Sequence, residues 1–156
     1  MASIEETAVS AATGERRRTM GLLAKASTAE LRAAFDALGV KPTVQPVRGP
    51  ETGLVMVRGR MGGGGAPFNL GEATVSRASI RMADGTVGHG QALGTDGEKA
   101  RLAAIFDALF QQPARKAEVE ALLDAIAARI AAEDAERTRQ TAATRVDFFT
   151  MVRGED

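Results

Sequence analysis

A glycine run beside several arginines is the part of the sequence best suited to bind an anion. Residues 61–67 read Met-Gly-Gly-Gly-Gly-Ala-Pro, and glycine lets successive backbone N–H groups approach a phosphate closely. The Gly-Lys-Ser/Thr of a P-loop is missing, and a bare glycine run is more typical of a mobile hairpin loop. The residues that we take as phosphate-facing candidates are Arg58, Arg60, Gly62, Gly63 and Arg77.

Conventional catalytic residues are sparse. The chain has one histidine, His89, and no cysteine, so thiolate metal sites, iron–sulfur ligation and a multi-histidine metal cage are excluded, and we expect no metal. A lone histidine is more often a surface or hairpin residue than a general base, although its pKa suits that role. The segment Gly88–Gly94 superficially resembles a dinucleotide fingerprint, but its last gap is one residue too long. The sequence therefore contains no self-sufficient active site.

The end of the chain is apolar where a soluble monomer would be polar. Residues 145–154 read Arg-Val-Asp-Phe-Phe-Thr-Met-Val-Arg-Gly, and such a segment should not stay exposed. It either folds back as a strand on its own sheet or docks into a partner, where a buried aromatic side chain is a common hot spot. We expect residues 145–156 to be a partner-docking tail, with these interface candidates: Arg145, Asp147, Phe148, Phe149, Met151 and Arg153.

The N-terminal part of the chain predicts two helices after a lead-in. Residues 1–15 show no apolar period, and we expect them to be a disordered lead-in. A short helix is expected over Glu15–Ala26, whose Arg16–Arg18 run is typical of a solvated face. Ser27 to Glu30 has the spacing of a capping box, and apolar residues then recur at helical spacing up to Gly39, which can end the helix.

The middle of the chain changes to strand periodicity. Four segments are rich in β-formers: residues 43–48, 54–61, 73–82 and 86–93. Asp84-Gly85 predicts a hairpin between the last two, and Pro46 confines its strand to an edge or bend of the sheet. Because tight hairpins join antiparallel strands, we predict an α+β fold with a small antiparallel sheet, flanking helices, and a C-terminal helix followed by an extended tail.

Two more helices are expected after the sheet. Thr95–Glu98 has a second capping-box spacing, and the helix that it opens carries a strong apolar stripe, which we expect Pro113 to close. Helical spacing continues from Val119 to Ile130. Beyond it, Glu133–Arg139 is charged on most sides, so this part of the helix projects into solvent or lies on another surface.

Composition limits the class of protein. The chain has 156 residues, 44% of them hydrophobic and 26% charged, as expected for one globular domain, which we place at residues 16–144. Twenty basic residues balance twenty acidic ones, and Tyr and Trp are absent, so nucleic-acid binding is disfavoured. No apolar run is long enough to span a membrane, and we expect a cytoplasmic protein.

Four stretches together resemble one known family: residues 51–58; residues 60–63 with Phe68 and residues 71–78; residues 84–88 continuing to 93–94; and the closing residues 145–154. The chain is similar there to the PhnG subunit family of the bacterial carbon–phosphorus lyase machinery, and the closing stretch is the most specific part. The resemblance runs from about Arg16 to the end. The first fifteen residues and the number of glycines in the loop depart from the familiar members.

The resemblance implies a role in phosphonate degradation within a core complex with PhnH, PhnI and PhnJ. With PhnI, PhnH and the ATPase homologue PhnL, such a subunit takes part in making α-D-ribose 1-methylphosphonate 5-triphosphate from ATP and methylphosphonate, with release of adenine. It implies that PhnI carries the nucleosidase-like chemistry and PhnJ the iron–sulfur step. We therefore expect no cofactor on this chain, with ATP as a substrate of the complex. The chain either contributes phosphate-facing arginines or is a scaffold without substrate contact.

Overall fold

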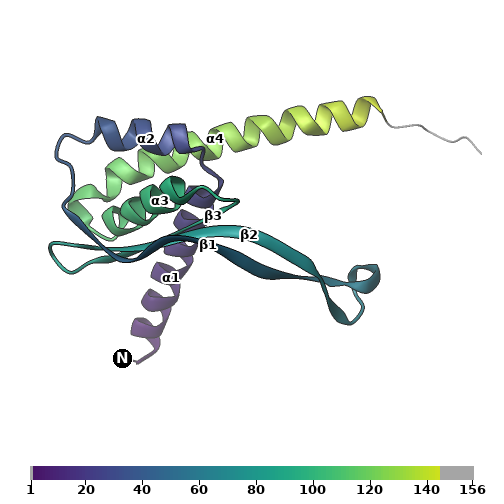
Figure 1. Cartoon of the computed structure of the whole chain (residues 1–156), viewed down its shortest axis with the longest axis horizontal. Coiled ribbons are helices and arrows are strands. Elements are labelled where there is room, and N and C mark those ends of the chain that lie inside the picture. The colour runs from purple at the N-terminus through teal and green to yellow at the C-terminus, as the bar shows by residue number, and fades with distance from the viewer. Residues whose placement is uncertain (1, 145–156) are drawn as a thin grey trace, which may run out of the picture.

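The computed structural model, which describes the backbone of residues 2–144 and the side chains of residues 12–144, is an α+β fold. The predicted fold class is confirmed. The elements in chain order are α1 (Ala2–Lys25), α2 (Thr28–Ala37), β1 (Val44–Arg60), the 3-10 turn η1 (Met61–Gly63), β2 (Pro67–Met82), β3 (Val87–Leu93), α3 (Gly97–Phe110) and α4 (Pro113–Ala143). A three-stranded antiparallel sheet packs with one face on α3, α2 and α4 lie on the outer side of that helix, and α1 runs past the edge strand β3 (Figure 1).

The sheet has the order β1-β2-β3, so two successive hairpins build it. The predicted Asp84-Gly85 turn joins β2 to β3: Gly85 has a φ of 88°, and the Met82 N–H donates to the Thr86 carbonyl at 2.8 Å. Pro46 lies in the edge strand β1 beside a register shift, as predicted from its missing N–H. The segments expected as separate strands around Pro46 and Leu54 form one long strand.

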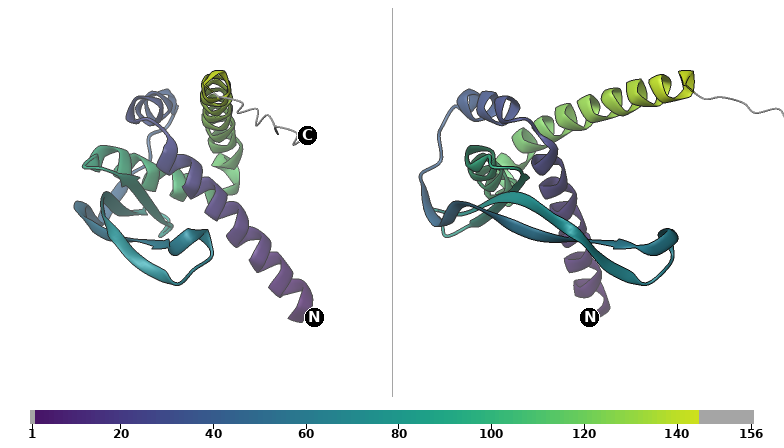
Figure 2. Two further views of the ribbon diagram at one scale, coloured as in Figure 1. Left: turned by 90° about the vertical axis from the view of Figure 1, so that its right-hand side faces the viewer. Right: turned by 45° about the vertical axis from the view of Figure 1, so that its right-hand side comes forward.

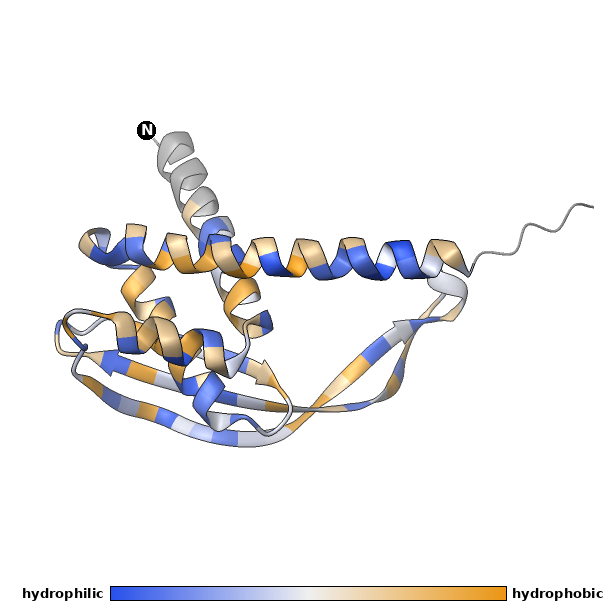
Figure 3. Cartoon of the chain, turned by 90° about the horizontal axis from the view of Figure 1, so that it is seen from above, coloured by the Kyte–Doolittle hydropathy of each residue, from blue (hydrophilic) through white to orange (hydrophobic). Residues whose placement is uncertain are grey.

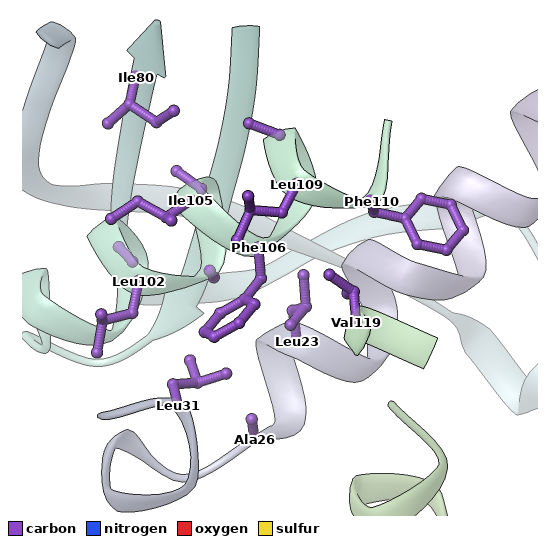
Figure 4. Packing of buried hydrophobic residues seen from close by; sticks show 14 of the residues in the cluster. Leu23, Ala26, Leu31, Ile80, Leu102, Ile105, Phe106, Leu109, Phe110 and Val119 are labelled. Carbon is purple, nitrogen blue, oxygen red and sulfur yellow. The ribbon is translucent and has the colours of Figure 1, made fainter. Parts of the chain in front are cut away.

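The core lies between the sheet and α3, which is buried on almost every side (Figure 4). Ile80 of β2 packs against α3 from the sheet, while Leu31 of α2 and Val119 of α4 meet the side of the helix that faces away from the sheet. The expected apolar stripe is present, but the alanines between its large residues are buried as well. Because α1, α2 and α4 all pack against α3, only Arg101 and the first turn of this helix remain at least partly exposed.

Helix ends agree with the sequence in one case and differ in another. Ser27 and Glu30 form the predicted capping box at the start of α2. The predicted box at Thr95 is wrong, because Asp96 is the N-cap of α3 and its carboxylate accepts the Lys99 N–H at 2.8 Å. Pro113 does not close α3, which ends at Phe110; it opens α4, where its missing N–H costs no helical hydrogen bond.

The first helix is longer than expected. Residues 2–15, which we expected to be a disordered lead-in with a helix starting only at Glu15, are helical as part of α1. The lead-in is rich in alanine, the strongest helix former, and its first turns contain Glu5 and Glu6, which favour the positive end of the helix dipole. Helix propensity therefore outweighs the missing apolar period.

The last helix extends beyond the body of the molecule, as its charge pattern predicts (Figures 1 and 3). Its buried residues, Val119, Leu123 and Ile126, all lie in its first half. The second half is exposed and carries ion pairs between its own side chains, among them Arg137 with Asp134 at 3.0 Å. The proposed docking tail, residues 145–156, lies outside the described residues.

Candidate functional site

The candidate anion site lies on a two-stranded ribbon that leaves the body of the molecule (Figures 1 and 2). β3 pairs with β2 only over Val75–Arg81, whereas β1 stays paired with β2 out to Arg60 and Pro67. Beyond the end of β3 the ribbon has two strands and no helix above it. We call residues 54–74 the hairpin arm.

The glycine run forms the tip of the hairpin arm. The N–H groups of Gly64 and Gly65 both donate to the Met61 carbonyl, the latter at 2.8 Å. Gly62 and Gly63 have φ values of 57° and 79°, a conformation that disfavours other residues. A side chain on Gly65 would place its Cβ only 2.6 Å from the Met61 oxygen. The turn itself therefore requires these glycines, whether or not an anion binds.

Arg58 and Arg60 lie directly before this tip. They alternate along β1, so both side chains stand on one face of the strand. Arg60 Nη1 donates to the Gly65 carbonyl at 3.3 Å, and both side chains are exposed. The structure thus brings Arg58 and Arg60 together with Gly62 and Gly63, two cations beside a glycine turn.

Arg77 does not join them. It pairs with Glu51 in the register of the sheet, and its Nε lies 2.9 Å from Glu51 Oε1, an oxygen that Arg48 also contacts at 2.7 Å. At about 3.3 Å per residue, Glu51 is roughly 23 Å from Arg58 along β1. The expectation that three arginines cluster near the loop is therefore wrong for Arg77, because a long hairpin separates residues that are near in sequence.

A buried carboxylate, Asp107 of α3, lies at the centre of a polar cluster that joins three elements. Its side chain is fully buried and accepts two hydrogen bonds from Arg16, from Nε at 3.0 Å and from Nη2 at 2.7 Å. The backbone N–H of His89 donates to the same carboxylate at 2.8 Å. Asp107 thus ties α1 and β3 to α3.

Arg16 corrects the interpretation of the basic run as a wholly solvated face. Its hydrogen bonds to Asp107 raise the pKa of the guanidinium, and the Coulombic attraction of that carboxylate adds to the effect, against a lowering by burial. Arg17 is exposed, and Arg18 only approaches an exposed aspartate at 3.9 Å. The sequence signal for this ion pair was Asp107 itself, a lone carboxylate inside the apolar stripe of α3, because a buried charge requires a partner.

His89 is a surface residue, in agreement with the interpretation of the sequence. Its ring is exposed on β3, and Nδ1 lies 2.8 Å from the Ser79 hydroxyl on β2. Within residues 12–144, no carboxylate contacts this ring to orient it, as a catalytic triad would need. The pair lies on an open strand surface and has no further catalytic group beside it.

The glycines beside His89 have a packing role that sequence reasoning missed. A Cβ on Gly88 would lie 2.0 Å from the Ala104 carbonyl oxygen, and one on Gly90 would lie 1.9 Å from that of Ala100. Both glycines therefore let the backbone of α3 lie directly on β3. The Gly-His-Gly spacing that superficially resembled a nucleotide motif is explained by close packing of a helix on a strand.

His89 is one of the residues that line a groove between α1 and β3. The groove measures about 400 Å³ and is lined mainly by apolar groups, with Met20, Ala24, Val75 and Leu93 among them. Lys25 is the charged residue in its lining. Among residues 12–144, no three His, Asp or Glu side chains are placed to hold a metal ion. None of the described helices is long and apolar enough to cross a membrane.

Comparison with known proteins adds what this geometry does not give. Residues 14–154 match the family described as phosphonate metabolism protein PhnG. The chain is also similar to the α-D-ribose 1-methylphosphonate 5-triphosphate synthase subunit PhnG of Rhizobium meliloti (strain 1021). The two sequences are 64% identical over 156 residues, which is the whole length of both.

Proposed function

The chain belongs to the PhnG family of phosphonate metabolism proteins, and from this premise we propose that it is an accessory subunit of a cytoplasmic complex that makes α-D-ribose 1-methylphosphonate 5-triphosphate from ATP and methylphosphonate, releasing adenine. The observation that carries the proposal is the full-length identity of 64% with a subunit of the synthase named for this product.

The side chains of the chain support an accessory role. Asp107 is held by Arg16 in a buried ion pair, and the ring of His89 is exposed beside a serine. Neither arrangement supplies an acid and a base facing one cavity, which glycosyl transfer needs. We place the chemistry on PhnI, with PhnH and PhnJ as the other core partners and PhnL associated.

The reaction would displace adenine from the anomeric carbon of the ribose by a phosphonate oxygen. An accessory subunit can assist by holding the triphosphate, because fixing reactants in line supplies about 7–11 kcal/mol of barrier lowering in favourable cases. Arg58 and Arg60 are suited to hold it, because they are exposed, adjacent on one face, and not tied to a carboxylate in the described residues. In the complex they would face the phosphates of ATP.

The proposal is tested in the assembled complex by replacing Arg58 and Arg60 with alanine, singly and together. Loss of a charge-assisted hydrogen bond of about 1.5–3 kcal/mol lowers kcat/KM for ATP roughly 10- to 100-fold. Arg81→Ala is the matched control, an exposed arginine of the same sheet away from the tip. Unchanged nucleotide affinity and turnover would remove both arginines from the site.

That result would favour the second candidate function, a scaffold of the carbon–phosphorus lyase core complex without substrate contact. The apolar surface of the hairpin arm favours this alternative, because its side chains suit a protein partner better than a nucleotide. The proposed docking tail, with Phe148 and Phe149, serves either function.

A further inference from the structure

The hairpin arm carries most of the exposed large apolar side chains of the described residues. Leu70 and Leu54 are 66% and 63% exposed. Monomeric proteins seldom expose so many large apolar groups in one place. The exposed apolar residues of the arm are Leu54, Met56, Val57, Met61, Phe68 and Leu70.

These side chains occupy both faces of the ribbon. Val57 and Gly59 alternate onto one face of β1. A Cβ on Gly59 would lie 3.5 Å from the Phe68 ring and 3.9 Å from the Leu70 Cβ, so Phe68 and Leu70 share the face of Val57. The register shift between Val57 and Arg58 breaks the alternation of β2 at this point. We call this the valine face.

Leu54 and Met56 alternate onto the other face of β1, together with Arg58. Leu54 pairs with Thr74 and Met56 with Glu72, so no large apolar neighbour covers them. The Thr52 and Ser76 hydroxyls, 3.0 Å apart, lie on this same face nearer the body. We call it the leucine face. Figure 3 shows apolar segments on both strands of the arm, with polar ones between them.

We propose, resting on the proposed function, that the hairpin arm inserts into a groove of another subunit of the synthase that encloses the valine face and the leucine face together. A ribbon that lies on a partner with one face keeps the other face polar, whereas strands buried on both faces are apolar on both. The arm carries large exposed apolar side chains on both faces: Leu54 and Met56 lie on the leucine face beside the polar Thr74 and Glu72, and Val57, Phe68 and Leu70 lie on the valine face. A partner that covered one face alone would leave the apolar side chains of the other face in water. A two-stranded ribbon is also marginally stable alone, so enclosure supplies the packing that it lacks.

The charges of the arm define the groove. Arg58 and Arg60 near the tip exceed the single acid of the arm, Glu72, so the inner end of the groove is anionic. Two grooves on the body of a second copy offer no anionic end: the hollow between α1 and β3 contains Lys25 and no carboxylate, and the groove between α1 and the start of α4 sets Arg16 and Lys116 against Glu15. The partner is therefore a different protein with an apolar channel that ends at an anionic group.

The absence of cysteine from this chain makes a direct test straightforward. Single variants Leu70→Cys on the valine face and Leu54→Cys on the leucine face are labelled with a maleimide, free and in the complex co-expressed with the other subunits. The label is read from the intact mass of this chain alone. Val40→Cys is the control, since Val40 is 74% exposed and lies off the arm.

Both arm thiols are expected to react at least about tenfold more slowly in the complex, because a covered thiol reacts only from the opened fraction. Val40→Cys should change little. Protection of one arm thiol alone would overturn enclosure, and reactivity of both would overturn the arm as an interface. Failure of the wild-type chain to co-purify with any other subunit would instead contradict the proposed function on which the inference rests.

A second measurement separates the two faces energetically. One double variant changes the valine face, Val57→Ser with Leu70→Ser, and the other changes the leucine face, Leu54→Ser with Met56→Ser. Each should lower the affinity of the chain for its partner by about 30-fold or more, as hot-spot losses do. Circular dichroism of each isolated variant checks that the exposed replacements leave the fold intact. A loss confined to one pair would show that the arm only lies on its partner.

Discussion

At the scale of single residues, the ion pair between Arg16 and Asp107 joins two helices that are far apart in the sequence. The carboxylate is fully buried, while the arginine side chain is 35% exposed. Burial of a charge is tolerated only when it is paired and hydrogen-bonded. The pair therefore contributes more to placing α1 against α3 than any surface ion pair of the chain.

Replacing Arg16 by alanine should lower the free energy of unfolding by about 3 kcal/mol, since it leaves a buried carboxylate without its charged partner. The measurement is urea unfolding followed by circular dichroism. Arg17→Ala is the matched control, because the Arg17 side chain is exposed. Its replacement should change the free energy of unfolding by less than about 0.5 kcal/mol. Equal effects of the two substitutions would contradict the role of Asp107.

Residue-level prediction succeeded where the chemistry was local. The exposed His89 and the capping box at Ser27 depend on neighbours within a few residues. Asp107 depends on Arg16, 91 positions away, and nothing in either local pattern identifies the other. The prediction that Arg77 lies near the glycine run failed for the same reason, because the register of the sheet sets the surroundings of this residue.

At the scale of elements, α3 is the helix around which the others pack, and its approach to β3 depends on two glycines. Gly88 and Gly90 leave no space for a Cβ against the backbone of α3. The alanines of α3 also allow this close approach, because small residues on both elements shorten the distance between helix and strand. Small side chains in this core are thus a requirement of close packing.

Gly90→Ala should destabilise the protein by about 3 kcal/mol or more, since the new methyl group would meet the Ala100 carbonyl at 1.9 Å and α3 would have to move. Thermal unfolding measures the effect. Gly71→Ala is the control: it is also a strand glycine, but a Cβ there has nothing within 4 Å. A wild-type melting temperature for Gly90→Ala would show that the packing is looser than described.

The cap of α3 predicts a pH dependence. A hydrogen bond from the Thr28 hydroxyl lowers the pKa of Asp96, and the Lys99 N–H lowers it further. As the pH falls, Asp96 is protonated first in the unfolded state, whose pKa is about 3.9. The stability that the charged Asp96 contributes is therefore present above that pH and is lost as the pH falls through the lower pKa of the folded state.

Asp96→Asn keeps the cap geometry without a titrating group. The stability advantage of the wild type over this variant should therefore shrink between about pH 5 and pH 2 in urea unfolding. A difference that stays constant across this range would show that the charge of Asp96 does not contribute.

At the scale of the whole molecule, three parts extend from a small core: the N-terminal half of α1, the hairpin arm and the second half of α4 (Figures 1 and 2). The fold class could be predicted because the Asp84-Gly85 turn and the helical periods are local signals. The hairpin arm could not be predicted, since its length depends on where β3 ends. The sequence suggested an anion site at the glycine run, but the apolar faces beside it emerge only from the register of β1 and β2.

The uncovered ribbon also bears on how the cell must handle this subunit. Chains synthesised in excess of their partners would expose the apolar hairpin arm and an unpaired strand edge to other proteins. They would be removed by aggregation or proteolysis. Under the proposed enclosure of the hairpin arm, the abundance of this protein should therefore follow that of the partner that covers the arm.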